Sequence, residues 1–72
     1  MLSRNNSFGK RIAYYRKLKG LTQKELALRA GIQTGYLSCI ETGKQTGKIS
    51  ILARIAWALG ISLEELIRDG EE

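Results

Sequence analysis

The chain has 72 residues with 12 Lys+Arg against 7 Asp+Glu, a net charge of +5, and a length that suits one small domain. No stretch approaches the roughly 20 apolar residues that span a bilayer, and the N-terminus lacks the apolar core of a secretion signal. A single cysteine, Cys39, excludes an internal disulfide, so helix packing has to hold the fold. We therefore expect a cytoplasmic protein.

Charge is divided unevenly along the chain. Seven basic residues and no acidic one lie between Arg4 and Lys24, whereas five of the seven acidic residues lie between Glu64 and Glu72. This pattern indicates a polyanion as a partner of the basic half, although a solvated charged surface would explain the same composition.

The apolar spacing is helical throughout. Leu52, Ile55, Ala56 and Leu59 give a full i, i+3, i+4, i+7 stripe, and no alternating strand pattern persists. After an N-terminal arm at residues 1–7, the sequence predicts five helices. They span Phe8–Lys19, Gln23–Ala30, Thr34–Thr42, Ile49–Leu59 and Leu63–Arg68.

Three joints between these helices follow one pattern, in which a glycine ends one helix and the third residue opens the next. Thr22 with Glu25, and Ser62 with Glu65, each predict a capping box. The middle joint instead places Gln33 at the cap position, where glutamine is a poor capping residue. Either Thr34 caps the helix one residue later, or Gln33 is required at the exposed tip.

The helix that Gln33 opens carries few charges. One side holds Leu37 and Ile40, and the other holds small or hydrogen-bonding side chains. Together with the preceding helix and the turn at Gly31, it forms a helix-turn-helix pattern. The second helix of such a pair enters the major groove, where short polar side chains can read base edges without blocking insertion.

At this point the sequence resembles the Cro/phage-repressor (xenobiotic-response-element) family, through FGKRIAYYRKLKGLTQKELALRAGI, YLSCIETGK and ILARIAWALGISLEEL. It is similar to small biofilm-type repressors and to restriction–modification controller proteins. The resemblance implies a compact all-α, five-helix, lambda-repressor-like domain over residues 1–72, with the helix-turn-helix core at 22–42. It also implies a bacterial or phage-type regulator of transcription. Such a regulator binds a palindromic operator in double-stranded DNA as a homodimer, and it is associated with the nucleoid when bound.

The resemblance also implies roles for matching positions. The positions that it places at DNA are Gln23, Gln33, Thr34, Gly35, Ser38, Cys39, Thr42 and Lys44. Arg16 and Glu41 match a partly buried ion pair. The sequence departs from the family pattern at two places: Gly35 stands where many relatives carry a long base-reading side chain, and Gly47-Lys48 replaces a better cap before the fourth helix. From its chemistry, Gln33 can pair with adenine through two hydrogen bonds.

Apolar residues near the C-terminal end exceed what so small a core can hold. Exposed apolar residues often mark an interface, and tryptophan is enriched among those that dominate binding. We therefore predict a symmetric dimer through Trp57 with Leu63 or Ile67. The alternative is that Trp57 covers its own core.

Two other functional classes would require features of their own. A protein-interaction module on the same fold, such as an antitoxin or an anti-regulator, would be indicated by a long partner-binding extension, and only DGEE follows the last predicted helix. An enzyme would need a nucleophile with its base, or a metal cluster, whereas the chain has no histidine and one cysteine. The sequence therefore predicts no catalytic residue, metal, cofactor, small-molecule substrate or membrane partner.

Overall fold

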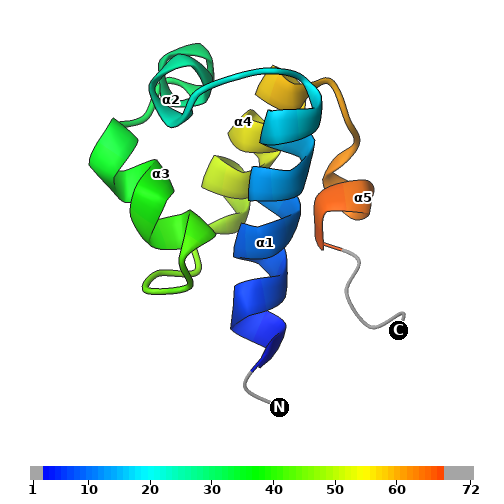
Figure 1. The fold of residues 1–72 in the computed structure, drawn as a ribbon. Coiled ribbons are helices and arrows are strands. Elements are labelled where there is room, and N and C mark those ends of the chain that lie inside the picture. Colours follow the sequence, from blue (N-terminus) through cyan, green and yellow to red (C-terminus); the bar gives the residue numbers. More distant parts are fainter. Residues whose placement is uncertain (1–2, 68–72) are drawn as a thin grey trace.

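Five helices follow one another in the computed structural model, which describes residues 3–67 (Figure 1). They are α1 (Ser3–Leu18), α2 (Gln23–Ala30), α3 (Thr34–Glu41), α4 (Ile49–Leu59) and α5 (Leu63–Ile67). The described residues contain no strand, so the all-α, five-helix prediction is confirmed. None of these helices combines the length and the hydrophobicity needed to cross a bilayer.

The predicted bounds of α2 and α4 agree with the structure, whereas α1 differs. It begins at Ser3 rather than at Phe8, so residues 3–7, predicted as part of an N-terminal arm, are helical. No glycine or proline stands between these two positions to end the helix. Met1 and Leu2 of the predicted arm, and Arg68 of the predicted last helix, lie outside the described residues.

The α3 helix is one residue shorter than predicted. It ends at Glu41, and Thr42 is its C-cap with φ −91° and ψ −2°. The Thr42 hydroxyl donates to the carbonyl oxygens of Ser38 at 3.0 Å and Cys39 at 3.3 Å. Gly43 follows with a left-handed φ of 86°, and the Lys44 N–H donates to the Cys39 carbonyl oxygen at 2.9 Å. The end of α3 is thus closed both by the Thr42 side chain and by a glycine turn.

All five helices contribute to one core. Its buried residues are Ile12, Leu26, Ala27, Ala30, Leu37, Ile40, Leu52, Ile55, Ala56, Leu59 and Leu66. The predicted stripe of α4 is buried along its whole length. Fully burying one such Leu or Ile side chain contributes about 1.5–3 kcal/mol, so this core is the main source of stability.

The predicted cap of α2 forms in full, and that of α5 forms in part. Thr22 Oγ1 accepts from the Glu25 backbone N–H at 3.0 Å, and Glu25 Oε1 accepts from the Thr22 N–H at 2.9 Å. At α5, Ser62 Oγ accepts from the Glu65 N–H at 3.0 Å, but Glu65 Oε2 accepts from the Tyr15 hydroxyl at 3.3 Å. Partial burial, and then the Glu65 carboxylate, raise the pKa of Tyr15 above its ordinary 10.0, so this hydroxyl remains a donor at neutral pH.

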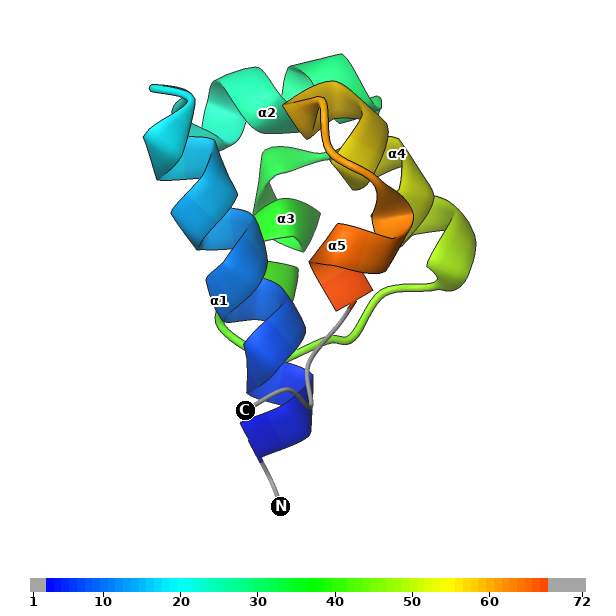
Figure 2. The ribbon, with the colours of Figure 1, turned by 90° about the vertical axis from the view of Figure 1, so that its right-hand side faces the viewer.

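The helices α3 and α5 lie on opposite sides of the molecule, with α1 and α4 between them (Figures 1 and 2). A ligand on the outer side of α3 therefore leaves α5 accessible.

Candidate nucleic-acid interface

The α3 helix has two faces of different chemistry. Leu37 and Ile40 are fully buried against the core. Thr34 and Gly35 are exposed, and Ser38 and Cys39, one turn later, are half-buried. The residues predicted to face DNA along α3 are thus brought together on one outward surface, which carries no charged side chain.

The two ends of this surface differ in how they are held. Gln33, at the N-cap, is exposed and makes no side-chain capping hydrogen bond, which leaves its amide free to bind a ligand. Beyond the other end, the Cys39 carbonyl oxygen accepts from the N–H groups of Lys44 at 2.9 Å and Gln45 at 3.2 Å. These bonds fix the loop backbone and present the exposed Lys44 next to the α3 surface.

Glu41 joins α3 to the two preceding helices. Arg16 Nε donates to Glu41 Oε2 at 2.8 Å, and Arg16 Nη2 donates to Glu41 Oε1 at 3.2 Å. The side chains of Arg16 and Glu41 are only 12% and 5% exposed. Arg16 Nη1 also donates to the Leu21 carbonyl oxygen at 2.9 Å. The structure therefore places the predicted ion pair at the junction of α1 and α3.

Gln23 belongs to the same network. Its Nε2 donates to Glu41 Oε1 at 2.9 Å, and its side chain is half-buried. The resemblance places Gln23 at DNA, and in the structure its amide nitrogen is engaged within the protein. Because one carboxylate holds both Arg16 and Gln23, the orientation of α3 relative to α1 and α2 is set by several bonds at once.

Gly9 also positions α3, and no sequence pattern predicted this role. A Cβ atom at Gly9 would overlap the carbonyl oxygens of Ile40 and Glu41, so only glycine permits this approach of α1 to the end of α3. The available signal was a glycine inside a helical apolar pattern, where it costs about 1 kcal/mol relative to alanine. At Gly35, by contrast, a Cβ atom would meet no described atom within 4 Å.

The N-terminus of α4 lacks a side-chain cap, as the Gly47-Lys48 sequence before it predicted. Lys48 occupies the N-cap with φ −84° and ψ 160°, and its side chain makes no capping hydrogen bond. Gly47 takes a left-handed φ of 75° in the loop before it. The segment between α3 and α4 therefore enters α4 through a left-handed glycine and without a side-chain N-cap.

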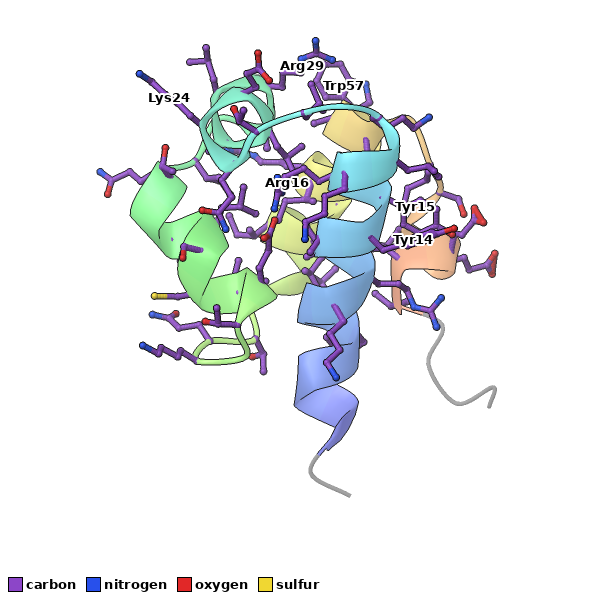
Figure 3. The ribbon with its side chains drawn as sticks, in the orientation of Figure 1. Tyr14, Tyr15, Arg16, Lys24, Arg29 and Trp57 are labelled. Carbon is purple, nitrogen blue, oxygen red and sulfur yellow. The ribbon has the colours of Figure 1, made fainter. Side chains whose placement is uncertain are left out.

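The three residues predicted at a dimer contact differ in exposure. Trp57 is 76% exposed, whereas Leu63 and Ile67 are half-buried and pack against the core. The alternative that Trp57 covers its own core is therefore wrong. Figure 3 shows Trp57 beside Arg29, at the end of the molecule where α2 and the last turn of α4 meet.

The described residues contain no group of three or more His, Cys, Asp or Glu side chains placed to hold a metal ion. The outward surface of α3 offers hydrogen bonds through short polar side chains, and the exposed Lys44 lies at its edge.

A family model described as helix-turn-helix matches residues 12–66 of this chain. The chain is 39% identical over 64 residues to y4dJ, an HTH-type transcriptional regulator of Sinorhizobium fredii, with 89% of this chain and 83% of y4dJ covered. It is 40% identical over 65 residues to the HTH-type transcriptional regulator SinR of Bacillus subtilis, where 89% of this chain spans 59% of SinR.

Solved structures agree with these sequence matches. The master regulator for biofilm formation SinR, in complex with DNA, aligns with a TM-score of 0.80 at 40% identity, covering 85% of this chain and 98% of that chain. The restriction–modification controller protein C.AhdI from Aeromonas hydrophila aligns with a TM-score of 0.84 at 30% identity, covering 92% of this chain and 98% of that chain.

Proposed function

Since the chain belongs to the helix-turn-helix family of DNA-binding transcription regulators, as its motifs predicted, we propose that it regulates transcription by binding double-stranded DNA at specific sequences. In this proposal α3 enters the major groove, and a homodimer brings two copies of α3 to the two halves of a palindromic operator in the cytoplasm. Half-sites one helical turn apart would lie about 34–36 Å from centre to centre. The proposed activity is binding, without a catalytic step.

One observation carries this proposal. The outward face of α3 consists of short, uncharged side chains, while its inner face and its C-terminal end are fixed by the core and by Glu41. A helix must be both slim and rigid to enter a groove roughly 12 Å wide and present base-reading groups in a fixed register. A helix face serving only solubility would carry more lysine and glutamate.

The residues of this surface divide into two proposed roles. Gln33 reads a base, because its free amide can donate to and accept from adenine at the N-terminal tip of α3. Thr34 and Ser38 can contact a thymine methyl group or a base edge, and Cys39 fills the half-buried position beside them. Lys44 and Thr42 lie at the C-terminal end, where contacts to phosphate position the protein without reading sequence.

The test is selection of bound sites from random duplex DNA, followed by affinity measurements on the selected site. We expect a palindromic consensus. Gln33→Ala should lose about 1–3 kcal/mol of binding and relax the preference at one position per half-site. Salt-sensitive binding without any preferred site would exclude specific readout.

A second variant separates base reading from phosphate binding. Lys44→Ala should weaken binding to all sequences alike and reduce the salt slope by about 1. Lys17→Ala removes the same charge from the exposed side of α1 and serves as the matched control. An equal effect of the two lysine variants would exclude a specific phosphate contact at Lys44.

A further inference from the structure

A groove of about 340 Å³ lies at the end of the molecule where α1, α2 and α4 meet. Leu21, Trp57 and Leu59 give it apolar walls, while Lys19 and Arg29 place two positive charges on its lining. Gly60, which ends α4, also lines it. We call this feature the Trp57 groove. None of its lining residues belongs to α3, so it is separate from the proposed DNA-binding surface.

The lining specifies what chemistry fits. Trp57 is 76% exposed, so a large aromatic surface would gain hydrophobic stabilisation on being covered. The described lining contains two cations and no acidic side chain. A favourable occupant therefore combines apolar groups with carboxylates, because opposite charges across a contact favour the partner and like charges oppose it.

The chain itself carries such a segment. Glu64 and Glu65 are exposed on α5, and five of the seven acidic residues fall at or after Glu64. Within one molecule α5 cannot turn into the groove, because Leu66 is fully buried in the core. A groove facing the same groove of another copy would set Lys19 and Arg29 against their own equivalents. An α5 helix that occupies the groove therefore comes from a second copy.

We infer that the Trp57 groove of one copy receives the acidic side of α5 from a second copy, and that the exchange is reciprocal. The receiving and the donated surfaces are neighbours on one copy, because Gly60 lines the groove and α5 begins at Leu63. In a two-fold dimer the same pair of surfaces then meets twice. The inference rests on the proposed homodimer and adds how its two subunits recognise each other.

Trp57 is the only tryptophan of the chain, so its fluorescence reports directly on the groove. With rising protein concentration in the absence of DNA, we expect the emission to shift to shorter wavelength together with the rise in mass measured by sedimentation. Trp57→Ala, at an exposed position, should weaken dimerisation by about 30-fold, the effect typical of a residue that dominates an interface. A dimer in which Trp57 keeps the emission of an exposed indole would overturn the inference.

Charge exchange gives a sharper test. Arg29→Glu and Glu64→Lys should each weaken self-association by at least about tenfold, because each sets like charges across both contacts. An equimolar mixture of the two variants, and the double variant, should restore it, since opposite charges then face each other again. Lys24→Glu is the matched control, because Figure 3 shows Lys24 on the side of α2 away from Trp57.

The outcomes are separable from those of the DNA experiments, because mass and fluorescence are measured without DNA. Unchanged association of Arg29→Glu, failure of the mixture to restore association, or a chain that stays monomeric at every concentration would each overturn the inference. Circular dichroism and thermal unfolding of each variant confirm that the fold is retained. If Gln33→Ala loses site selection while its self-association stays intact, the change affects DNA binding alone, and the inferred dimer contact stands.

Discussion

The two helices of the helix-turn-helix unit have the same length, eight residues, and are stabilised in different ways. The α2 helix carries its own supports: a complete capping box at Thr22 and a left-handed glycine at Gly31. The α3 helix has no side-chain cap at Gln33 and contains Gly35, which lowers helix propensity. Its local support is confined to the C-terminal end, where the Thr42 hydroxyl caps the helix. The other supports come from neighbouring elements, through the contacts of Glu41 with α1 and α2 and the close approach of Gly9.

The difference teaches how a binding surface can coexist with a stable fold. Caps and good helix formers on the outward side of α3 would occupy the positions that we propose to meet DNA. The stabilising contacts of α3 lie instead on its inner face and at its C-terminal end. A helix held by its neighbours can vary its exposed residues without unfolding, whereas a locally capped helix depends on its own sequence.

The largest expected effect comes from removing the support that α3 draws from its neighbours. Glu41→Ala leaves Arg16 buried without its carboxylate, and we expect the free energy of unfolding to fall by about 3–5 kcal/mol. Glu25→Ala removes only one exposed half of the α2 cap and should cost about 1 kcal/mol. Urea unfolding of both variants measures the difference. Equal losses would contradict a special role for the Glu41 network.

Gly9→Ala tests the other external support of α3. The added methyl group would meet the carbonyl oxygens of Ile40 and Glu41, so α1 and the end of α3 must separate. We expect a loss of about 1–3 kcal/mol, typical of overpacking, although alanine favours a helix more than glycine does. Thermal unfolding gives the sign directly. A stabilised Gly9→Ala protein would show that the two helices do not approach so closely.

Removing the cap of α2 and adding one to α3 should reverse the difference in capping between the two helices. Thr22→Ala removes the α2 cap and should cost about 0.5–2 kcal/mol. Gln33→Ser should instead stabilise α3 by up to about 1 kcal/mol while weakening binding to the selected operator. Unfolding and DNA titration of the same two proteins test both effects. A Gln33→Ser protein with unchanged operator affinity would remove Gln33 from the proposed interface.

The smallest effect is expected at Gly35. Alanine there meets no described atom within 4 Å and gains helix propensity, so Gly35→Ala should stabilise the protein by about 0.5–1 kcal/mol. Gly31→Ala, at φ 74°, is the matched control and should destabilise, because alanine is strained in that conformation. Thermal unfolding separates the two. A destabilised Gly35→Ala protein would indicate that the backbone of α3 departs from a regular helix there.

Much of this fold could be predicted because its signals are local. The bounds of α2 and α4 follow from an apolar period and a glycine that ends each helix, and the Thr22 cap depends on residues three apart. The start of α1 was missed because no residue there forbids a helix. Only one of the two hydrogen bonds of the capping box predicted for Ser62 and Glu65 forms, because the Glu65 carboxylate binds Tyr15, which is distant in the sequence.

The candidate site was predictable in part for the same reason. The outward face of α3 follows from helical spacing, and the ion pair of Arg16 with Glu41 came from the resemblance. The approach at Gly9 depends on the angle between two helices, which no local pattern encodes. Likewise, the sequence does not show that Lys19, Arg29 and Trp57 line one groove, because the turn after α1, the helix α2 and the helix α4 bring them together.

The open space over Gly35 has a consequence for how such proteins diversify. Because a Cβ atom there meets no described atom within 4 Å, a side chain can be added at the proposed DNA surface by changing one codon. A library randomised at this position alone would show how far target choice can be changed while the rest of the protein stays constant.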